Sequence, residues 1–322
     1  MMGATGVEFT TQGSKLRRMM LFRRIQRRHA LACVALLGLG ACERAKTPAR
    51  ADSAANKPVA AADSVATAQS HSWDQSAGPL LLVAADAPSR AFIVVPDSAT
   101  AGSTLAAIPH PASVTLFSRS GTVQEAELPA VADSGLCTVA SLNAAPPPRP
   151  WNVGFIGGVV SPLPIDSTET LSRSDSASLV VWMNRLASGI PNDSAGRFAG
   201  LPFVVRNIWR FTLPSGQQAI VSNLSRQINQ EASPLSESTF LVAERPASDT
   251  TFSTVYYERS FGAEETLQSR DLLAGALIGA NRNPALIIVR DFGDATAYGI
   301  IERGDDGKWR ARWSSARRRC AP

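Results

Sequence analysis

Histidine and cysteine are scarce in this chain of 322 residues, which contains three and four of them. Only His110 falls in the part that we expect to fold, and one histidine excludes a zinc cage built on several histidines and the HExxH pattern of zinc proteases. The GxSxG turn of serine hydrolases and a GxGxxG turn that opens a helix are also missing. We therefore predict no catalytic residue, no cofactor and no metal ligand.

The apolar run near the N-terminus is too short to cross a membrane. Ala30–Gly40 has 11 residues, whereas a membrane-spanning helix needs roughly 20. The run follows four arginines within residues 23–28 and ends in small residues, which is the arrangement of a secretory signal. We expect residues 1–41 to be removed, and we interpret residues 1–18 as an over-extended start.

The four residues that close this run, Leu39-Gly40-Ala41-Cys42, resemble the lipobox of bacterial lipoproteins. The resemblance implies that Cys42 becomes the first residue of the mature chain and carries lipid, including palmitate. The membrane would then be a partner through this lipid. In proteobacterial lipoproteins, an aspartate directly after the lipidated cysteine favours retention in the inner membrane. This chain has Glu43 at that position, so the pattern indicates the outer membrane without deciding which face of it. An ordinary signal peptide that contains a cysteine is the alternative.

Removal of the signal changes the charge balance of the chain. Residues 1–41 hold seven basic side chains and Glu8, a net charge of +6, and subtracting this from the +5 of the full chain leaves −1. A protein that binds nucleic acid needs a concentrated basic surface to displace counterions. We therefore exclude nucleic acid as a partner.

Two cysteines remain once the signal and the lipidated residue are set aside. Cys137 and Cys320 lie in an exported chain, and disulfides persist in oxidising compartments. They have no CxxC spacing or histidine partners, as a zinc site would, and a thiolate nucleophile would need a nearby base. We predict a disulfide between Cys137 and Cys320.

Composition divides the mature chain into a tether and one domain. Residues 42–77 are rich in Ala, Ser, Asp and Pro, with Trp73 as the only aromatic residue. Such a segment buries too little apolar surface to offset the entropy of ordering its backbone. We expect a disordered linker over residues 42–77 and a single β-rich domain over residues 78–320.

The domain shows short apolar runs separated by turn sequences, which is typical of antiparallel strands. The clearest turn is Gly304-Asp305-Asp306-Gly307, and Pro284–Arg290 has the pattern of a fully buried strand. The expected strand pairs are 80–83 with 92–95, 114–117 with 123–128, 203–213 with 217–224, 239–244 with 252–258, and 298–302 with 308–314. A further strand is expected over residues 136–142.

One helix interrupts the strands. Leu179, Trp182, Met183 and Leu186 recur on one helical face behind Ser and Asp capping candidates, which predicts a core-packing helix over about residues 173–188. We therefore expect a mainly β fold with one short helix, either propeller-like or an irregular multi-sheet domain. A β-sandwich is the alternative.

A faint repeat runs through three of the expected hairpins. Arg119, Arg245 and Arg303 each end an apolar strand that contains an aromatic residue and precede a polar turn. Residues 203–314 resemble degenerate blades of FG-GAP/VCBS-type β-propellers. The acidic calcium loop of that family is reduced here, so the resemblance implies blade geometry and not metal binding.

Two groups of side chains are candidates for function. Asp291 with Asp294, or Glu264-Glu265, would allow a carboxylate-dependent hydrolase of the cell envelope. Aromatic residues gather in the C-terminal half, where strand alternation leaves some of them free to bind a glycan or a peptide. We favour a lipid-anchored envelope protein with a non-catalytic binding or structural role, whose partner is an envelope protein or a glycan. The carboxylate-dependent hydrolase is the alternative.

Overall fold

The computed structural model describes residues 72–97, 100–131, 138–167, 171–191, 196–229, 234–263 and 266–319. Four of the expectations above lie outside the described residues. These are the signal over residues 1–41, the lipidated Cys42, the linker up to residue 71, and the Cys137–Cys320 pair.

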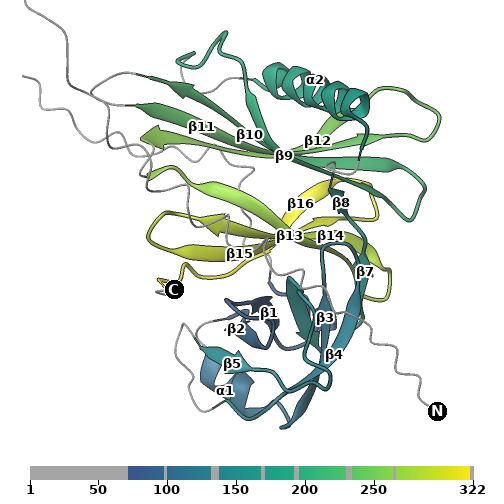
Figure 1. The fold of residues 1–322 in the computed structure, drawn as a ribbon, viewed down its shortest axis with the longest axis vertical. Helices are drawn as coiled ribbons and strands as arrows, with labels where there is room; N and C mark the ends of the chain where they lie inside the picture. The colour runs from purple at the N-terminus through teal and green to yellow at the C-terminus, as the bar shows by residue number, and fades with distance from the viewer. Residues whose placement is uncertain are drawn as a thin grey trace, which may run out of the picture. The chain divides into compact units, whose positions relative to one another are not determined.

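The described residues form three antiparallel sheets (Figure 1). The first sheet has six strands in the order β4-β3-β6-β1-β2-β5. Its strands are β1 (Leu81–Ala84), β2 (Arg90–Val94), β3 (Ala112–Phe117), β4 (Val123–Leu128), β5 (Val139–Ser141) and β6 (Val153–Ile156). The outer strands of this sheet are tied together, because Glu127 and Asn143 exchange two backbone hydrogen bonds of 2.8 and 2.9 Å.

The second and third sheets are both built on a meander of four consecutive strands. The second has the order β12-β11-β10-β9-β8 and the third the order β16-β15-β14-β13-β7. The meander strands are β9 (Val204–Thr212), β10 (Gln218–Ile228), β11 (Leu235–Arg245), β12 (Ser253–Ala263), β13 (Ser269–Ile278), β14 (Asn283–Asp291), β15 (Thr296–Arg303) and β16 (Trp309–Ser314). Two short strands, β7 (Val160–Leu163) and β8 (Asp166–Ser167), complete the sheets.

The helix forms where the periodicity predicts it. α2 covers Arg173–Gly189, and the Ser172 side chain caps it by accepting a hydrogen bond from the backbone N–H of Asp175. Met183 is fully buried in a cluster with residues of β9 and β10, and Leu179, Trp182 and Leu186 pack half-buried against this cluster. Two shorter helical segments were not predicted, η1 (Gln75–Ala77) and α1 (Ala101–Ala106).

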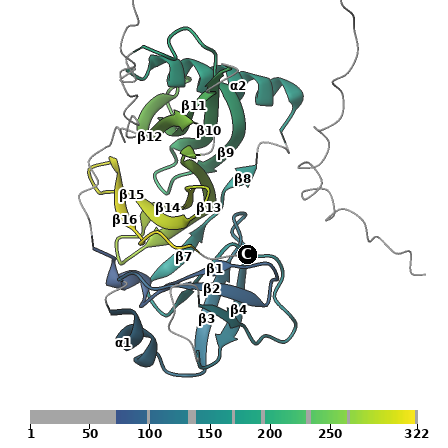
Figure 2. The same ribbon diagram turned by 90° about the vertical axis from the view of Figure 1, so that its left-hand side faces the viewer.

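These elements are stacked in successive layers (Figure 2), which four apolar clusters join. One lies between α2 and the second sheet, and the next lies between the second and third sheets. A third cluster joins the third sheet to the first, and the fourth fills the opposite face of the first sheet beside α1. Both faces of the third sheet are therefore buried, as the apolar run of β14 predicts. The mainly β, multi-sheet prediction is confirmed, whereas a two-layer sandwich does not describe three stacked sheets.

The two meanders repeat each other in detail. Arg245 ends β11 and Arg303 ends β15, each the third strand of its meander. A register shift toward the fourth strand lies between Val242 and Ala243 in the first meander and between Ile300 and Ile301 in the second. A β-bulge strengthens the local twist of a strand pair. The same 58-residue offset thus relates both the arginines and the bulges.

The segment that follows the last strand connects the third sheet to the first. β16 pairs with β15 in the third sheet, as expected, whereas β5 pairs with β2 in the first. In the segment after β16, Arg318 donates to the backbone oxygens of Ile93 at 2.8 Å and Val95 at 3.2 Å.

The packed part of the chain begins before the expected boundary at Gly78. Trp73 is 7% exposed, its indole N–H donates to the carbonyl of Gly78 at 2.7 Å, and its ring lies edge-to-face with Trp313 at 4.8 Å. Ala77 is fully buried in the same cluster. Residues 72–77 therefore belong to the domain, because one large aromatic side chain buries enough apolar surface to hold the segment down.

We expect Trp73→Ala to lower the free energy of unfolding by about 3–5 kcal/mol, the usual cost of removing a buried tryptophan side chain. Trp182→Ala is the matched control, because Trp182 is only half-buried on α2 and should cost less. Chemical denaturation of the mature protein measures both. Equal losses in the two variants would contradict the assignment of Trp73 to the core.

Candidate functional site

The carboxylates proposed for hydrolysis lie in an exposed turn and are held locally. Asp291 accepts a hydrogen bond from the backbone N–H of Gly293 at 2.8 Å. Asp294 pairs with Arg319 at 3.0 Å, and both side chains are mostly exposed. Glu264 and Glu265 lie outside the described residues. Within the described part of the chain, no three His, Cys, Asp or Glu side chains are grouped so that they could hold a metal ion.

The aromatic residues of the C-terminal half do not form an exposed strip. Only Tyr257 is substantially exposed, at 38%. The others are buried between the sheets, namely Trp209, Phe211, Tyr256, Tyr298, Trp309 and Trp313. Strand alternation predicts that about half of such residues face solvent, but here layers on both sides of the third sheet cover them.

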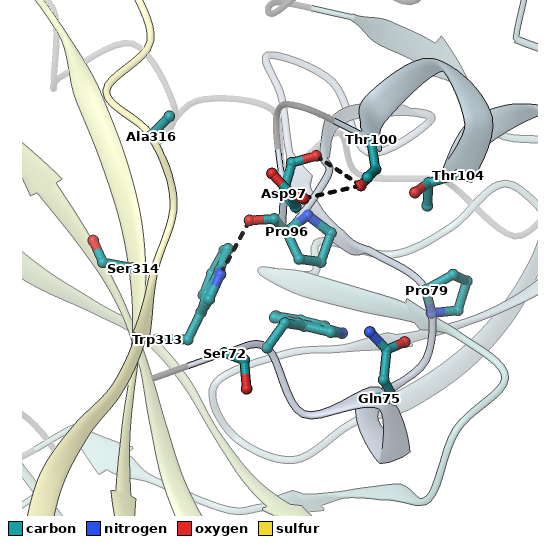
Figure 3. Close-up of a pocket in the computed structure, with 11 residues that line it drawn as sticks. Ser72, Gln75, Pro79, Pro96, Asp97, Thr100, Thr104, Trp313, Ser314 and Ala316 are labelled. Atoms are coloured by element: carbon teal, nitrogen blue, oxygen red, sulfur yellow. Dashed lines mark hydrogen bonds between the residues drawn. The ribbon is translucent and has the colours of Figure 1, made fainter. Parts of the chain in front are cut away.

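The described surface contains a hollow beside Trp73 and Trp313, which we call the indole pocket (Figure 3). Its volume is about 520 Å³, within the range of roughly 300–1,000 Å³ that is usual for small-molecule sites. The described residues that line it are Ser72, Trp73, Gln75, Pro79, Pro96, Asp97, Thr100, Thr104, Trp313, Ser314 and Ala316. Three separate stretches of the chain therefore contribute to one site.

Local hydrogen bonds fix the walls of the indole pocket. On one wall, the Thr100 hydroxyl donates to the backbone oxygen and the carboxylate of Asp97, both at 3.3 Å, at the start of α1. On the facing wall, Trp313 at the end of β16 donates its indole N–H to the carbonyl of Pro96 at 3.3 Å. Figure 3 shows Gln75 and Pro79 opposite Ser314 and Ala316 across the pocket. The site is thus held by the packing of β16 against the loop that follows β2.

The indole pocket carries little charge. Asp97 is the only side chain among its described lining residues that ionises near neutral pH, and none of them is Lys, Arg or His. The indole N–H groups of Trp73 and Trp313 are already used within the protein. The polar side chains that line the pocket carry hydroxyls, one amide and one carboxylate, and its apolar surface comes mainly from proline rings, because Trp73 and Trp313 are 7% and 5% exposed.

A second hollow of about 650 Å³ lies at the seam that closes the first sheet. It is lined by residues of β3, β4 and the segment after β5, with Ser113, Glu125, Glu127 and Asn143 as its polar side chains. The backbones of Glu127 and Asn143 form the seam itself. This hollow contains no aromatic residue among its described lining, so it is a comparison site for the indole pocket.

Three buried ionic clusters lie inside the described fold and are not open to a ligand. Glu258 of β12 accepts from Arg270 at 2.5 Å and from Arg290 at 2.6 Å. Glu244 accepts from Arg303 at 2.8 Å, and the fully buried Glu237 accepts from Arg226 at 2.9 Å. Charges buried in this way are paired because an isolated buried charge is very costly. We interpret these clusters as structural links.

The Glu258 cluster shows the strongest electrostatic perturbation that bears on stability. Burial by itself raises the pKa of Glu258, but the charge and hydrogen bond of Arg290, the charge of Arg270 and the hydroxyl of Tyr256 outweigh it and lower the pKa to about 2. Burial and the neighbouring carboxylate raise the pKa of Tyr256. Glu258 is therefore ionised and Tyr256 neutral across the physiological range.

No motif in the sequence indicates the indole pocket. Asp97 and Thr104 have no motif around them, and Trp73 was placed in the linker. One signal was available, since a single tryptophan within an Ala- and Ser-rich segment has no role in a solvated chain. The aromatic partner of Trp73, Trp313, lies 240 residues away in the sequence, so no local pattern identifies it.

Among the described residues, no helix has the length and apolarity needed to span a membrane. Comparisons of the chain with protein-family models, with curated proteins and with solved structures gave no match.

Proposed function

We propose that this protein is a lipid-anchored component of the bacterial cell envelope whose domain binds a ligand in the indole pocket without transforming it. The lining chemistry carries the proposal. A carboxylate-dependent hydrolase needs two carboxyl groups flanking the bond that breaks, and Asp97 is the only carboxylate among the described lining residues. The remaining groups are suited to hold a ligand by hydrogen bonds and apolar contact.

The anchor of the proposed protein is the lipid on Cys42, with the outer membrane as its location. The lipobox-like residues 39–42 and the tether that follows them support this part of the proposal. From its composition alone, we propose that this segment acts as a flexible tether. It would let the indole pocket reach envelope components at some distance from the bilayer.

Binding is tested with an envelope extract and the mature protein, immobilised in parallel with the variant Gln75→Ala/Thr104→Ala. Gln75 is exposed and Thr104 half-buried, so the fold should survive both changes. We expect at least one component to be retained by the wild type and lost from the variant, and to be recovered chemically unchanged. Equal retention by both, or release of a cleaved product, would overturn the proposed function.

We expect Cys42→Ala to leave an unprocessed precursor that incorporates no labelled palmitate, because the acceptor thiol is gone. Cys33→Ala is the matched control, since Cys33 lies within the apolar run of the signal and its loss should change neither processing nor labelling. Metabolic labelling and gel mobility measure both. A Cys42→Ala protein that is still labelled and processed would contradict the anchor.

A further inference from the structure

The polar groups of the indole pocket are suited to a ligand rich in hydroxyl groups. Ser72, Gln75, Asp97 and Thr100 are exposed at the pocket, and Thr104 is half-buried. Hydroxyl and amide side chains both donate and accept, and a carboxylate accepts. A ligand whose own groups both donate and accept can therefore be matched at several points around the rim.

The apolar groups of the pocket offer carbon surface and no additional donors. Trp73 and Trp313 lie edge-to-face at 4.8 Å, and both of their N–H groups are bonded to backbone carbonyls of the protein. Pro79 and Pro96 add ring surface. Pyranose rings have a comparable mixture, with hydroxyl groups at the edge and C–H groups on the faces.

The charge of the pocket argues against an anionic ligand. Phosphate, sulfate and carboxylate groups are normally held by arginine, lysine or several backbone N–H groups, and the described lining contains no basic side chain. Arg290 comes near, donating to the Ser314 hydroxyl at 3.4 Å, but its guanidinium is bound to Glu258 at 2.6 Å. Asp97 would repel an anion as well.

We propose that the indole pocket binds a neutral saccharide. The proposal rests on the proposed binding function and names its ligand class. Hydroxyl groups of the sugar would meet Gln75, Thr104 and Asp97, while a C–H face would rest on the half-buried rings of Pro79 and Pro96 and on the edges of the two indoles that remain exposed. An extended peptide fits less well, because peptide recognition by strand addition uses a row of backbone donors and acceptors, and two of the lining residues are prolines without an N–H.

Calorimetric titration of the mature protein with chitotetraose, cellotetraose and maltotetraose tests the proposal. We expect saturable binding of at least one of the three. Loss of one neutral hydrogen bond weakens binding about fivefold, so Gln75→Ala/Thr104→Ala should weaken it at least tenfold. Within the described residues neither side chain makes a hydrogen bond, so the thermal unfolding midpoint should stay unchanged.

The comparison site supplies the matched control. Glu125→Gln/Asn143→Ala changes two exposed side chains in the second hollow and should leave the affinity for the sugar unchanged.

Asp97→Asn should keep the turn with Thr100, because an amide oxygen also accepts, and it should keep binding within about tenfold.

Three outcomes would overturn the saccharide proposal. The first is the absence of heat change with all three sugars, and the second is binding that the pocket variant does not alter. The third is selective binding of proline-containing peptides or of sulfated sugars in the same pocket. The third outcome leaves the proposed binding function standing, whereas that function fails if the envelope extract yields nothing that depends on Gln75 and Thr104, or if it yields a cleaved product.

Discussion

Glu258→Gln is expected to lower the free energy of unfolding by about 3–5 kcal/mol, the usual cost of removing one partner from a buried ion pair. Glu258 lies between Arg270 and Arg290, and the side chains of these three residues are 6–13% exposed. An amide in its place leaves two buried guanidinium groups without a countercharge. The shape of the side chain is kept, so the loss reports the charge and not a cavity.

The matched control is Asp86→Asn, which removes an ion pair to Arg90 of comparable length, 2.7 Å, whose side chains are 46–68% exposed. Exposed pairs contribute about 0–1 kcal/mol because water screens them. Chemical denaturation at pH 7 measures both variants. A Glu258→Gln protein as stable as Asp86→Asn would show that the cluster contributes no net stability.

The same carboxylate predicts how stability changes in acid. Its pKa is lowered from 4.5 to about 2 in the folded protein, so the folded state favours the ionised form. The contribution of Glu258 is therefore fully present above about pH 4.5 and is lost as the pH falls toward 2. The difference in unfolding free energy between wild type and Glu258→Gln should shrink across this window, and a difference that stays constant would contradict the lowered pKa.

The local elements of the fold could be predicted because their signals lie in short stretches. The turn at Gly304–Gly307 closes with a hydrogen bond of 3.0 Å between Gly304 and Lys308, and Gly307 has a φ of 76°, which glycine adopts without strain. α2 follows directly from its apolar periodicity. The partners of β7 and β8 could not be predicted, since these strands join sheets whose other strands come much later in the chain.

The buried charges were missed for a different reason. Charged residues in strands are mostly exposed, so Glu258 and Arg290 gave no reason to expect them inside the fold. Their places in the pattern were nevertheless visible, because Glu258 shares a strand face with Tyr256 and Arg290 ends the apolar run of β14. Alternation indicates which face a residue takes, but only the stacking of a further sheet decides whether that face is buried.

Cys137 and Cys320 lie outside the described residues, so their disulfide stays a prediction, but described residues that adjoin each of them contact β2. Thr138 follows Cys137, and its carbonyl accepts a hydrogen bond from the N–H of Ile93 at 3.0 Å. Arg318 precedes Cys320 by two residues and donates to the carbonyl of the same Ile93 at 2.8 Å. In an extended strand both backbone groups of one residue point to the same side. The two neighbouring segments therefore reach β2 from one side.

Replacing both Cys137 and Cys320 with serine should lower the free energy of unfolding by about 4–5 kcal/mol. The bridge would close a loop from residue 137 to residue 320, and in the chain-entropy model a loop of this length restricts the unfolded chain by that amount. The double variant avoids a single unpaired thiol, and reductant should destabilise the wild type while leaving the double variant unchanged.

Alkylation before reduction provides an independent measurement, because a bridged mature chain gains no label at either cysteine. Two labelled cysteines in the folded, unreduced protein would refute the bridge.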